Sequence, residues 1–189
     1  IVFFHKSLFT NAAGPPACVT VSATGTVWQN LPLVSSQAGT FTAEVDATPL
    51  AAGMSGGVGL TNGSQTTFGG LACSARFYTN GRIEARNGSN YTAANSILYS
   101  PNTTYHFRFV VNVPAHTYSV YVTPSGGSEL LVGLNYAFRP EQAAVSSLNN
   151  WSLFSDIGSM RACGFGAPCY TAIAGGGWIN NAFTSQSTA

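Results

Sequence analysis

The chain has 189 residues, only 7% of them charged, and a formal net charge of +1, whereas a typical soluble domain carries about 25% charged residues. This balance excludes a basic stripe for phosphates, so we expect no nucleic-acid partner, and no apolar run reaches the roughly 18 residues of a membrane span. The length suits a single domain over residues 1–189, in which the Gly-, Ser- and Thr-rich segment from about 174 could form a loose tail.

Alternating apolar and polar residues, bounded by Gly, Pro and Asn, recur along the chain and predict β-strands. The one helical candidate is a turn or two within RPEQAAVSSL, residues 139–148. Many short strands at this spacing predict an all-β fold, namely a two-sheet antiparallel β-sandwich or jelly roll. In chain order the expected strands fall within 39–49, 56–63, 71–78, 82–86, 105–113, 117–123, 128–138 and 151–158.

The segment ARFYTNGRIEARNG, residues 75–88, concentrates charge around an Asn80-Gly81 turn. A three-residue loop over 79–81, with Gly81 left-handed, separates the apolar side chains from the polar ones, and it places Arg76 opposite Glu84. A two-residue loop would mix them, so the first register is expected. One face then holds Cys73, Ala75, Phe77, Ile83 and Ala85, and the other holds Ser74, Arg76, Tyr78, Arg82, Glu84 and Arg86.

A second hairpin is predicted in TYHFRFVVNVPAHTYSVYVTP, residues 104–124. Pro114 cannot adopt a positive φ, which excludes a two-residue primed turn that starts there. A four-residue loop over 113–116 instead pairs Phe107 with Val122 on an apolar face. The opposite face then carries His106, Arg108 and Tyr121.

The cysteines and the sequons indicate secretion. Cys18, Cys73, Cys163 and Cys169 form no CxxC motif and have no histidine at zinc spacing. An even set of this kind fits two disulfides in an oxidising compartment, and three pairings are open; we lean to Cys163–Cys169 and Cys18–Cys73. Glycosylation is expected at one or more of the N-x-[ST] sequons at Asn62, Asn87, Asn90, Asn102 and Asn150.

Three blocks in this order, ARFYTNGRIEARNGSNY, TYHFRFVVNVPAHTYSVYVTPSGG and NYAFRPEQ, resemble the concanavalin A-like, laminin-G-like group of β-sandwiches. The similarity covers roughly residues 40–165. The resemblance implies a jelly roll of the kind found with secreted carbohydrate-active proteins. It implies no reaction, because this fold serves lectins, hydrolases and lyases alike.

The arginines and tyrosines on the polar faces of the two hairpins are the first candidate ligand site. A guanidinium can hold a sugar carboxylate or vicinal hydroxyls bidentately, and an aromatic ring can stack on a sugar. The alternative is a cross-strand ion pair of Arg76 with Glu84, worth up to about 1 kcal/mol, among solvated neighbours. The candidate ligand-binding residues are Arg76, Tyr78, Arg82, Glu84, Arg86, His106, Arg108 and Tyr121.

Two sets of residues carry the enzymatic alternatives. Glu44 and Asp46 share a strand face, but the glucanase-like pattern E-x-D-x-x-E lacks its third acid, since Pro49 occupies that place. A polysaccharide lyase could use His106, Tyr121 and Arg108 as base, acid and carboxylate partner. The Q-x-H motif of alginate-lyase-type jelly rolls is absent.

The sequence therefore favours a secreted, lectin-like protein that binds a polysaccharide, and it favours binding over catalysis. A polysaccharide lyase for uronate-containing glycans is the alternative, followed by a glycoside hydrolase and by a structural extracellular assembly protein. We expect no cofactor. A structural calcium ion held by Asp46 or Asp156 is a further expectation, since carboxylate oxygens suit this cation.

Overall fold

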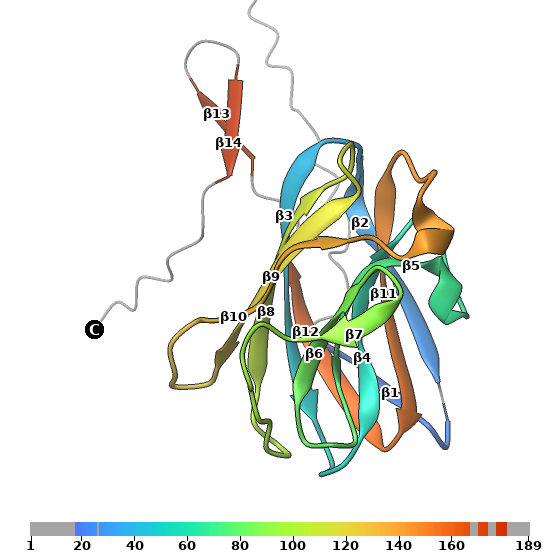
Figure 1. The fold of residues 1–189 in the computed structure, drawn as a ribbon, viewed down its shortest axis with the longest axis vertical. Coiled ribbons are helices and arrows are strands. Elements are labelled where there is room, and N and C mark those ends of the chain that lie inside the picture. Colours follow the sequence, from blue (N-terminus) through green and yellow to red (C-terminus); the bar gives the residue numbers. More distant parts are fainter. Residues whose placement is uncertain (1–17, 26, 167–169, 174–176, 181–189) are drawn as a thin grey trace, which may run out of the picture.

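The chain folds into a sandwich of two six-stranded antiparallel sheets (Figure 1). The computed structural model describes residues 18–25, 27–166, 170–173 and 177–180. Sheet A runs in the order β1 (Cys18–Ser22), β12 (Ser159–Gly166), β3 (Thr40–Pro49), β8 (Tyr105–Asn112), β9 (Thr117–Pro124) and β10 (Leu130–Ala137). Sheet B runs in the order β2 (Trp28–Gln37), β11 (Leu148–Ile157), β4 (Ser55–Thr61), β5 (Leu71–Phe77), β6 (Ile83–Asn87) and β7 (Asn90–Thr92).

Helical structure in the described residues is limited to two 3-10 turns, η1 (Phe68–Gly70) and η2 (Pro140–Gln142). The second lies within the helical candidate of 139–148. The all-β prediction is thus confirmed. No helix of this described portion is long and apolar enough to cross a membrane.

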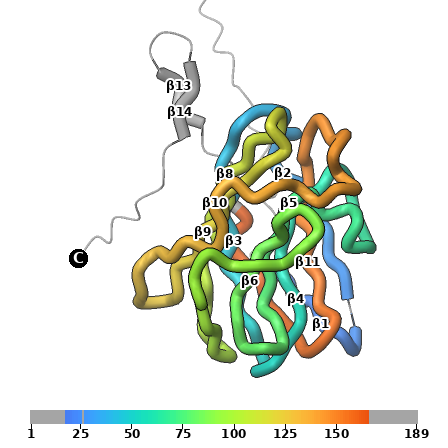
Figure 2. Tube along the Cα trace, in the orientation of Figure 1, coloured from blue at the N-terminus to red at the C-terminus, as the bar shows by residue number. Residues whose placement is uncertain are grey.

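Strands that are distant in sequence lie next to each other in both sheets. In the trace of Figure 2 the blue strand β2 lies beside the orange strand β11, which is far from it in the sequence. Strand β1 pairs with β12, and β11 pairs with both β2 and β4. These crossovers between distant strands, in place of simple hairpins alone, produce the jelly-roll topology.

Alternation along each strand fills the space between the sheets. Strand β8 shows it most clearly, because every second residue from Tyr105 is buried. Aromatic rings from both sheets interlock there, with ring centroids 5.7 Å apart for Phe109 and Trp151. The largest fully buried side chains of this core are Trp151, Tyr118, Phe41, Phe77, Phe107 and Phe109.

Both predicted hairpin registers are confirmed. In the first, Arg76 pairs with Glu84 and Phe77 pairs with Ile83, and Gly81 has a φ of 78° in the left-handed region. The backbone N–H of Tyr78 donates to the Arg82 carbonyl at 2.9 Å, which closes the three-residue loop. The second hairpin has these pairs: Phe107 with Val122, Arg108 with Tyr121, and His106 with Thr123.

The expected disulfide pairing is wrong. Cys18 is bonded to Cys163, its partner across the β1–β12 ladder, with Cα atoms 4.1 Å apart. Cys73 is a free, fully buried thiol on the inner face of β5, where burial raises its pKa. Cys169 lies outside the described residues. The error arose because sequence proximity favoured a short loop, whereas β1 and β12 meet only through the tertiary fold.

Part of the predicted tail forms a strand, and four of the five sequon asparagines are exposed. Residues 177–180 of the tail form β14 (Gly177–Asn180), which pairs with β13 (Tyr170–Ile173) as a separate two-stranded sheet. Asn150 is only partly exposed and lies in the middle of sheet B, paired on both sides. The other four sequon asparagines, Asn62, Asn87, Asn90 and Asn102, are exposed. Glycosylation and secretion stay predictions.

Candidate functional site

The outer face of sheet B carries the polar side of the first hairpin. Ala75 and Phe77 of β5 face the core, so the alternation of the strand turns Arg76 outward. Glu84 and Arg86 face outward from β6 for the same reason. The next strand, β7, adds Tyr91, which pairs with Arg86 in the ladder.

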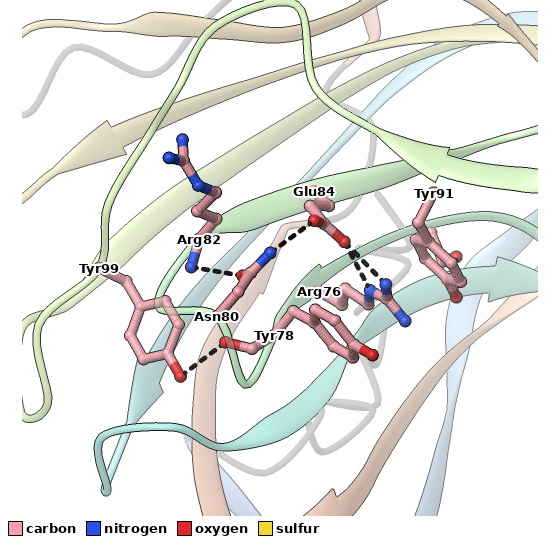
Figure 3. Close-up of polar contacts among 8 residues, drawn as sticks. Arg76, Tyr78, Asn80, Arg82, Glu84, Tyr91 and Tyr99 are labelled. Carbon is pink, nitrogen blue, oxygen red and sulfur yellow. Dashed lines mark hydrogen bonds and ion pairs between the residues drawn. The ribbon is translucent and has the colours of Figure 1, made fainter.

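Arg76 is clamped between two tyrosines on this face (Figure 3). Its guanidinium carbon lies 3.8 Å from the ring centroid of Tyr78 and 3.7 Å from that of Tyr91. Its Nη2 and Nε donate to Glu84 Oε2 at 2.7 Å and 3.1 Å. The second oxygen of Glu84 accepts from Asn80 Nδ2 at 3.1 Å. Stacking and ion pairing together fix the guanidinium, and they neutralise its charge locally.

This clamp forms one wall of an open hollow of about 310 Å³ on the outer face of sheet B, which is at the low end of the roughly 300–1,000 Å³ of small-molecule sites. Across from the clamp lie aromatic rings: Phe68 and Phe154 meet edge to face at 5.0 Å, and Trp28 lies 5.4 Å from Phe154. The residues that line the hollow are Ser55, Phe68, Arg76, Tyr78, Arg86, Tyr91, Arg139, Phe154 and Asp156.

Strand β4 has glycines at its outward-facing positions, so side chains of the neighbouring strands can lie over this strand on the outer face of sheet B. Val58 and Leu60 of this strand are buried in the core, so the outward positions between and beside them are Gly57 and Gly59. A Cβ on Gly57 would lie 3.0 Å from the Cβ of Arg76. The missing side chain therefore leaves room for Arg76 to lie against the sheet.

The hollow has an excess of positive charge. Arg86 is held by its Nε, which donates to the Gly88 carbonyl at 2.8 Å, and burial together with the charge of Arg139 lowers its pKa. Among the described residues, neither Arg86 nor Arg139 has a carboxylate within ion-pair distance. Asp156 is the one acid that lines the hollow; although the residue is exposed, partial burial of its carboxyl group raises its pKa, and the charge of Arg76 opposes the shift.

A second polar cluster lies on the outer face of the other sheet. Here His106 Nδ1 is 2.8 Å from Asp46 Oδ1, and its Nε2 is 3.9 Å from Glu44 Oε2. Arg108 donates to both oxygens of Glu129, at 2.8 Å and 2.6 Å. Its guanidinium carbon also lies 4.1 Å from the ring centroid of Tyr121. In contrast to the arginines of the hollow, both His106 and Arg108 have carboxylate partners within this cluster.

The His106 cluster should give the protein a pH-dependent stability. The hydrogen bond with Asp46 is the main cause that raises the pKa of His106, and Glu44 and Glu129 raise it further. A raised folded-state pKa stabilises the protein below the unfolded value of about 6.5, and this contribution is lost as the pH rises through the folded pKa. We expect Asp46→Asn to have a lower melting temperature than the wild type, and we expect this difference to be larger at about pH 6 than at about pH 9. The effect will be small because the His106 side chain is 42% exposed, and an equal difference at both pH values would contradict it.

The structure brings together only part of the predicted ligand site. Arg76, Tyr78, Glu84 and Arg86 lie at or beside the hollow, whereas Arg82 points away from the clamp and donates to Ser96 (Figure 3). The remaining predicted residues, His106, Arg108 and Tyr121, lie on the opposite side of the sandwich. The predicted ligand-binding arginines therefore do not share a single binding surface.

Several residues of the hollow were missed in the sequence. Tyr91 could have been found, since it follows the first hairpin within the sequon N-Y-T. Arg139 lies in NYAFRPEQ, but nothing local indicates that it turns towards β5. Phe68, Phe154 and Trp28 meet only because η1, β11 and β2 converge, so their separate positions in the chain carry no signal.

The predicted calcium ligands lie far apart in the fold. Asp46 belongs to sheet A and Asp156 to sheet B. No group of three or more His, Cys, Asp or Glu side chains placed to hold a metal ion occurs in the part of the chain that the structure describes. A calcium site therefore stays a prediction from the sequence.

Comparisons with known proteins define the class of fold. No known protein-family profile matches the chain. It is 30% identical over 122 residues to a gellan lyase from Bacillus sp., a match that spans 63% of this chain but only 5% of the lyase. It resembles a sialidase in structure (TM-score 0.52, 11% identity, 77% of this chain and 14% of the sialidase). It also resembles peanut lectin bound to a nine-residue peptide (TM-score 0.50, 11% identity, 80% of this chain and 90% of the lectin). The fold is thus a concanavalin A-like jelly roll, as the sequence blocks predicted.

Proposed function

We propose that the protein is an extracellular lectin-like module that binds a polysaccharide in the hollow on the outer face of sheet B. The observation that carries the proposal is the clamped guanidinium of Arg76, which lines one hollow together with the partly exposed ring of Phe68; the buried Phe154 supports that ring edge to face. Fixed donors orient sugar hydroxyls, and flat rings pack on the apolar face of a pyranose. The match to a gellan lyase and the likeness to peanut lectin support a carbohydrate ligand.

The positions and partners of the candidate lyase residues favour binding over catalysis. The predicted base, His106, lies on sheet A, on the opposite side of the sandwich from the hollow, and its Nδ1 is held by Asp46. Arg108, the predicted partner for a substrate carboxylate, is already occupied by Glu129. The gellan lyase match keeps a lyase as the second candidate, and ultraviolet absorbance of an unsaturated uronate product would establish it.

The test is a comparison of two arginines that each stack on tyrosine but lie on opposite outer faces. We expect Arg76→Ala to weaken polysaccharide binding about tenfold or more, since a charge-assisted hydrogen bond contributes roughly 1.5–3 kcal/mol. Arg108→Ala is the matched control and should leave binding unchanged. Affinity electrophoresis or titration calorimetry with gellan, polygalacturonate, alginate and neutral glucans measures both variants.

Two results would contradict the proposal. One is a loss of affinity in Arg108→Ala with none in Arg76→Ala, which would place the ligand on sheet A. The other is the absence of binding to every polymer together with self-association of the protein at low concentration. That second result would favour an extracellular assembly protein.

A further inference from the structure

Arg139 is the one buried charged residue among those that the structure describes, with 6% of its surface exposed. It lies between β10 and η2, and its backbone N–H donates to the Ala72 carbonyl of β5 at 3.0 Å. This bond fixes the residue beside sheet B, where its side chain lines the hollow. The buried Nε has no hydrogen-bond partner in the described structure.

The unpartnered Nε of Arg139 is unfavourable, because burial removes its hydration and no hydrogen bond replaces it. The same hollow contains Arg86, whose pKa is lowered by burial and by the charge of Arg139. The nearby acids do not pair with either arginine: Asp156 lines the hollow and Glu141 acts on Arg86 only at a distance. Both Asp156 and Glu141 are exposed to solvent. A bound anion would give the two arginines the charge partner that they lack and would relieve the repulsion between them.

The ligand that fits is a carboxylate carried by a sugar ring. Planar guanidinium groups match the geometry of carboxylates, and Phe68, which is 37% exposed, offers a ring face in the same hollow. Arg76 is not assigned this role, because Glu84 occupies its Nη2 and Nε and leaves only Nη1 to donate to a sugar hydroxyl. We infer that Arg139 and Arg86 form a carboxylate subsite in the hollow, so that the polysaccharide contains uronate residues; this inference rests on the proposed function.

The test compares ligands that differ only in charge. Titration calorimetry is carried out with oligogalacturonate and oligoalginate and with their carboxyl esters. We expect the wild type to bind one of the two acids about tenfold or more tightly than its ester. Arg139→Gln should weaken binding of that acid by a similar factor, leave binding of the ester unchanged, and so abolish the preference. Arg82→Gln, an exposed arginine near the same sheet that does not line the hollow, is the matched control and should keep the preference.

The outcomes separate this inference from the proposed function. Binding of the acid and its ester with equal affinity, or an unchanged preference in Arg139→Gln, would overturn the carboxylate subsite but leave polysaccharide binding intact. No binding to any polysaccharide would overturn both. Tighter binding of poly-glutamate than of either uronate would overturn the assignment and would show that the anion is an acidic peptide. If Arg139→Gln does not fold, Arg86→Gln and the wild-type comparison of acid with ester decide the question.

Discussion

Replacing Cys18 and Cys163 together by alanine should lower the free energy of unfolding by about 2–5 kcal/mol. The disulfide closes a loop with a sequence separation of 145 residues, for which chain entropy predicts about 5 kcal/mol at the upper end. It also ties β1, at the edge of sheet A, to β12. Urea denaturation of the wild type and the double variant, without reductant, measures the difference.

The free thiol provides the contrast. Cys73→Ala removes only a small buried side chain, so its effect should be smaller, about 1 kcal/mol. Mapping of peptides under non-reducing conditions should recover Cys18 linked to Cys163, and the native protein should protect Cys73 from alkylation because it is fully buried. A peptide that links Cys18 to Cys73, or a double variant as stable as the wild type, would contradict this account.

The second large effect is expected at Gly57, beneath the side chain of Arg76. A Cβ at this position would lie 2.2 Å from the Ala75 carbonyl oxygen and 2.8 Å from the Arg76 Cα. Both are backbone atoms of the paired strand β5, so the clash cannot be relieved by a change of rotamer. We expect Gly57→Ala to cost about 3 kcal/mol, at the upper end for overpacking, and to weaken polysaccharide binding because Arg76 is displaced.

A matched substitution separates the clash from the loss of glycine itself. Gly39 has nothing within 4 Å of the position that a Cβ would occupy, so Gly39→Ala should change stability by less than about 1 kcal/mol, in the stabilising direction. Thermal melting of the two variants checks the difference. Equal melting temperatures for Gly57→Ala and the wild type would show that β4 and β5 do not approach this closely.

The hairpins could be predicted in detail because their information is local. Turn residues and a two-residue period determine the register, and only one register buries Phe77 with Ile83 while it leaves Arg76 opposite Glu84. The same argument succeeded for the loop that contains Pro114. In both cases a shift by one residue would have turned polar side chains into the core, so the sequence excluded it.

The disulfide and the hollow could not be predicted, because they depend on which sheet each strand joins. Alternation shows that Arg76 and Arg108 both face outward, but it does not show that they face outward from opposite sheets. The pairing of Cys18 with Cys163 requires knowledge that β1 and β12 are neighbours. Arg139 is buried only because its segment returns to β5, a contact between parts of the chain that are distant in sequence.

The central claim is that the outer face of sheet B, and not that of sheet A, binds the polysaccharide. Titration of the isotopically labelled protein with a polysaccharide fragment that it binds, followed by amide NMR spectra, tests this claim most directly. We predict that the perturbed amides belong to β5, β6 and β7, to the end of β11 near Asp156, and to the segment around Arg139. Perturbations confined to β3, β8 and β9, around His106 and Arg108, would contradict it.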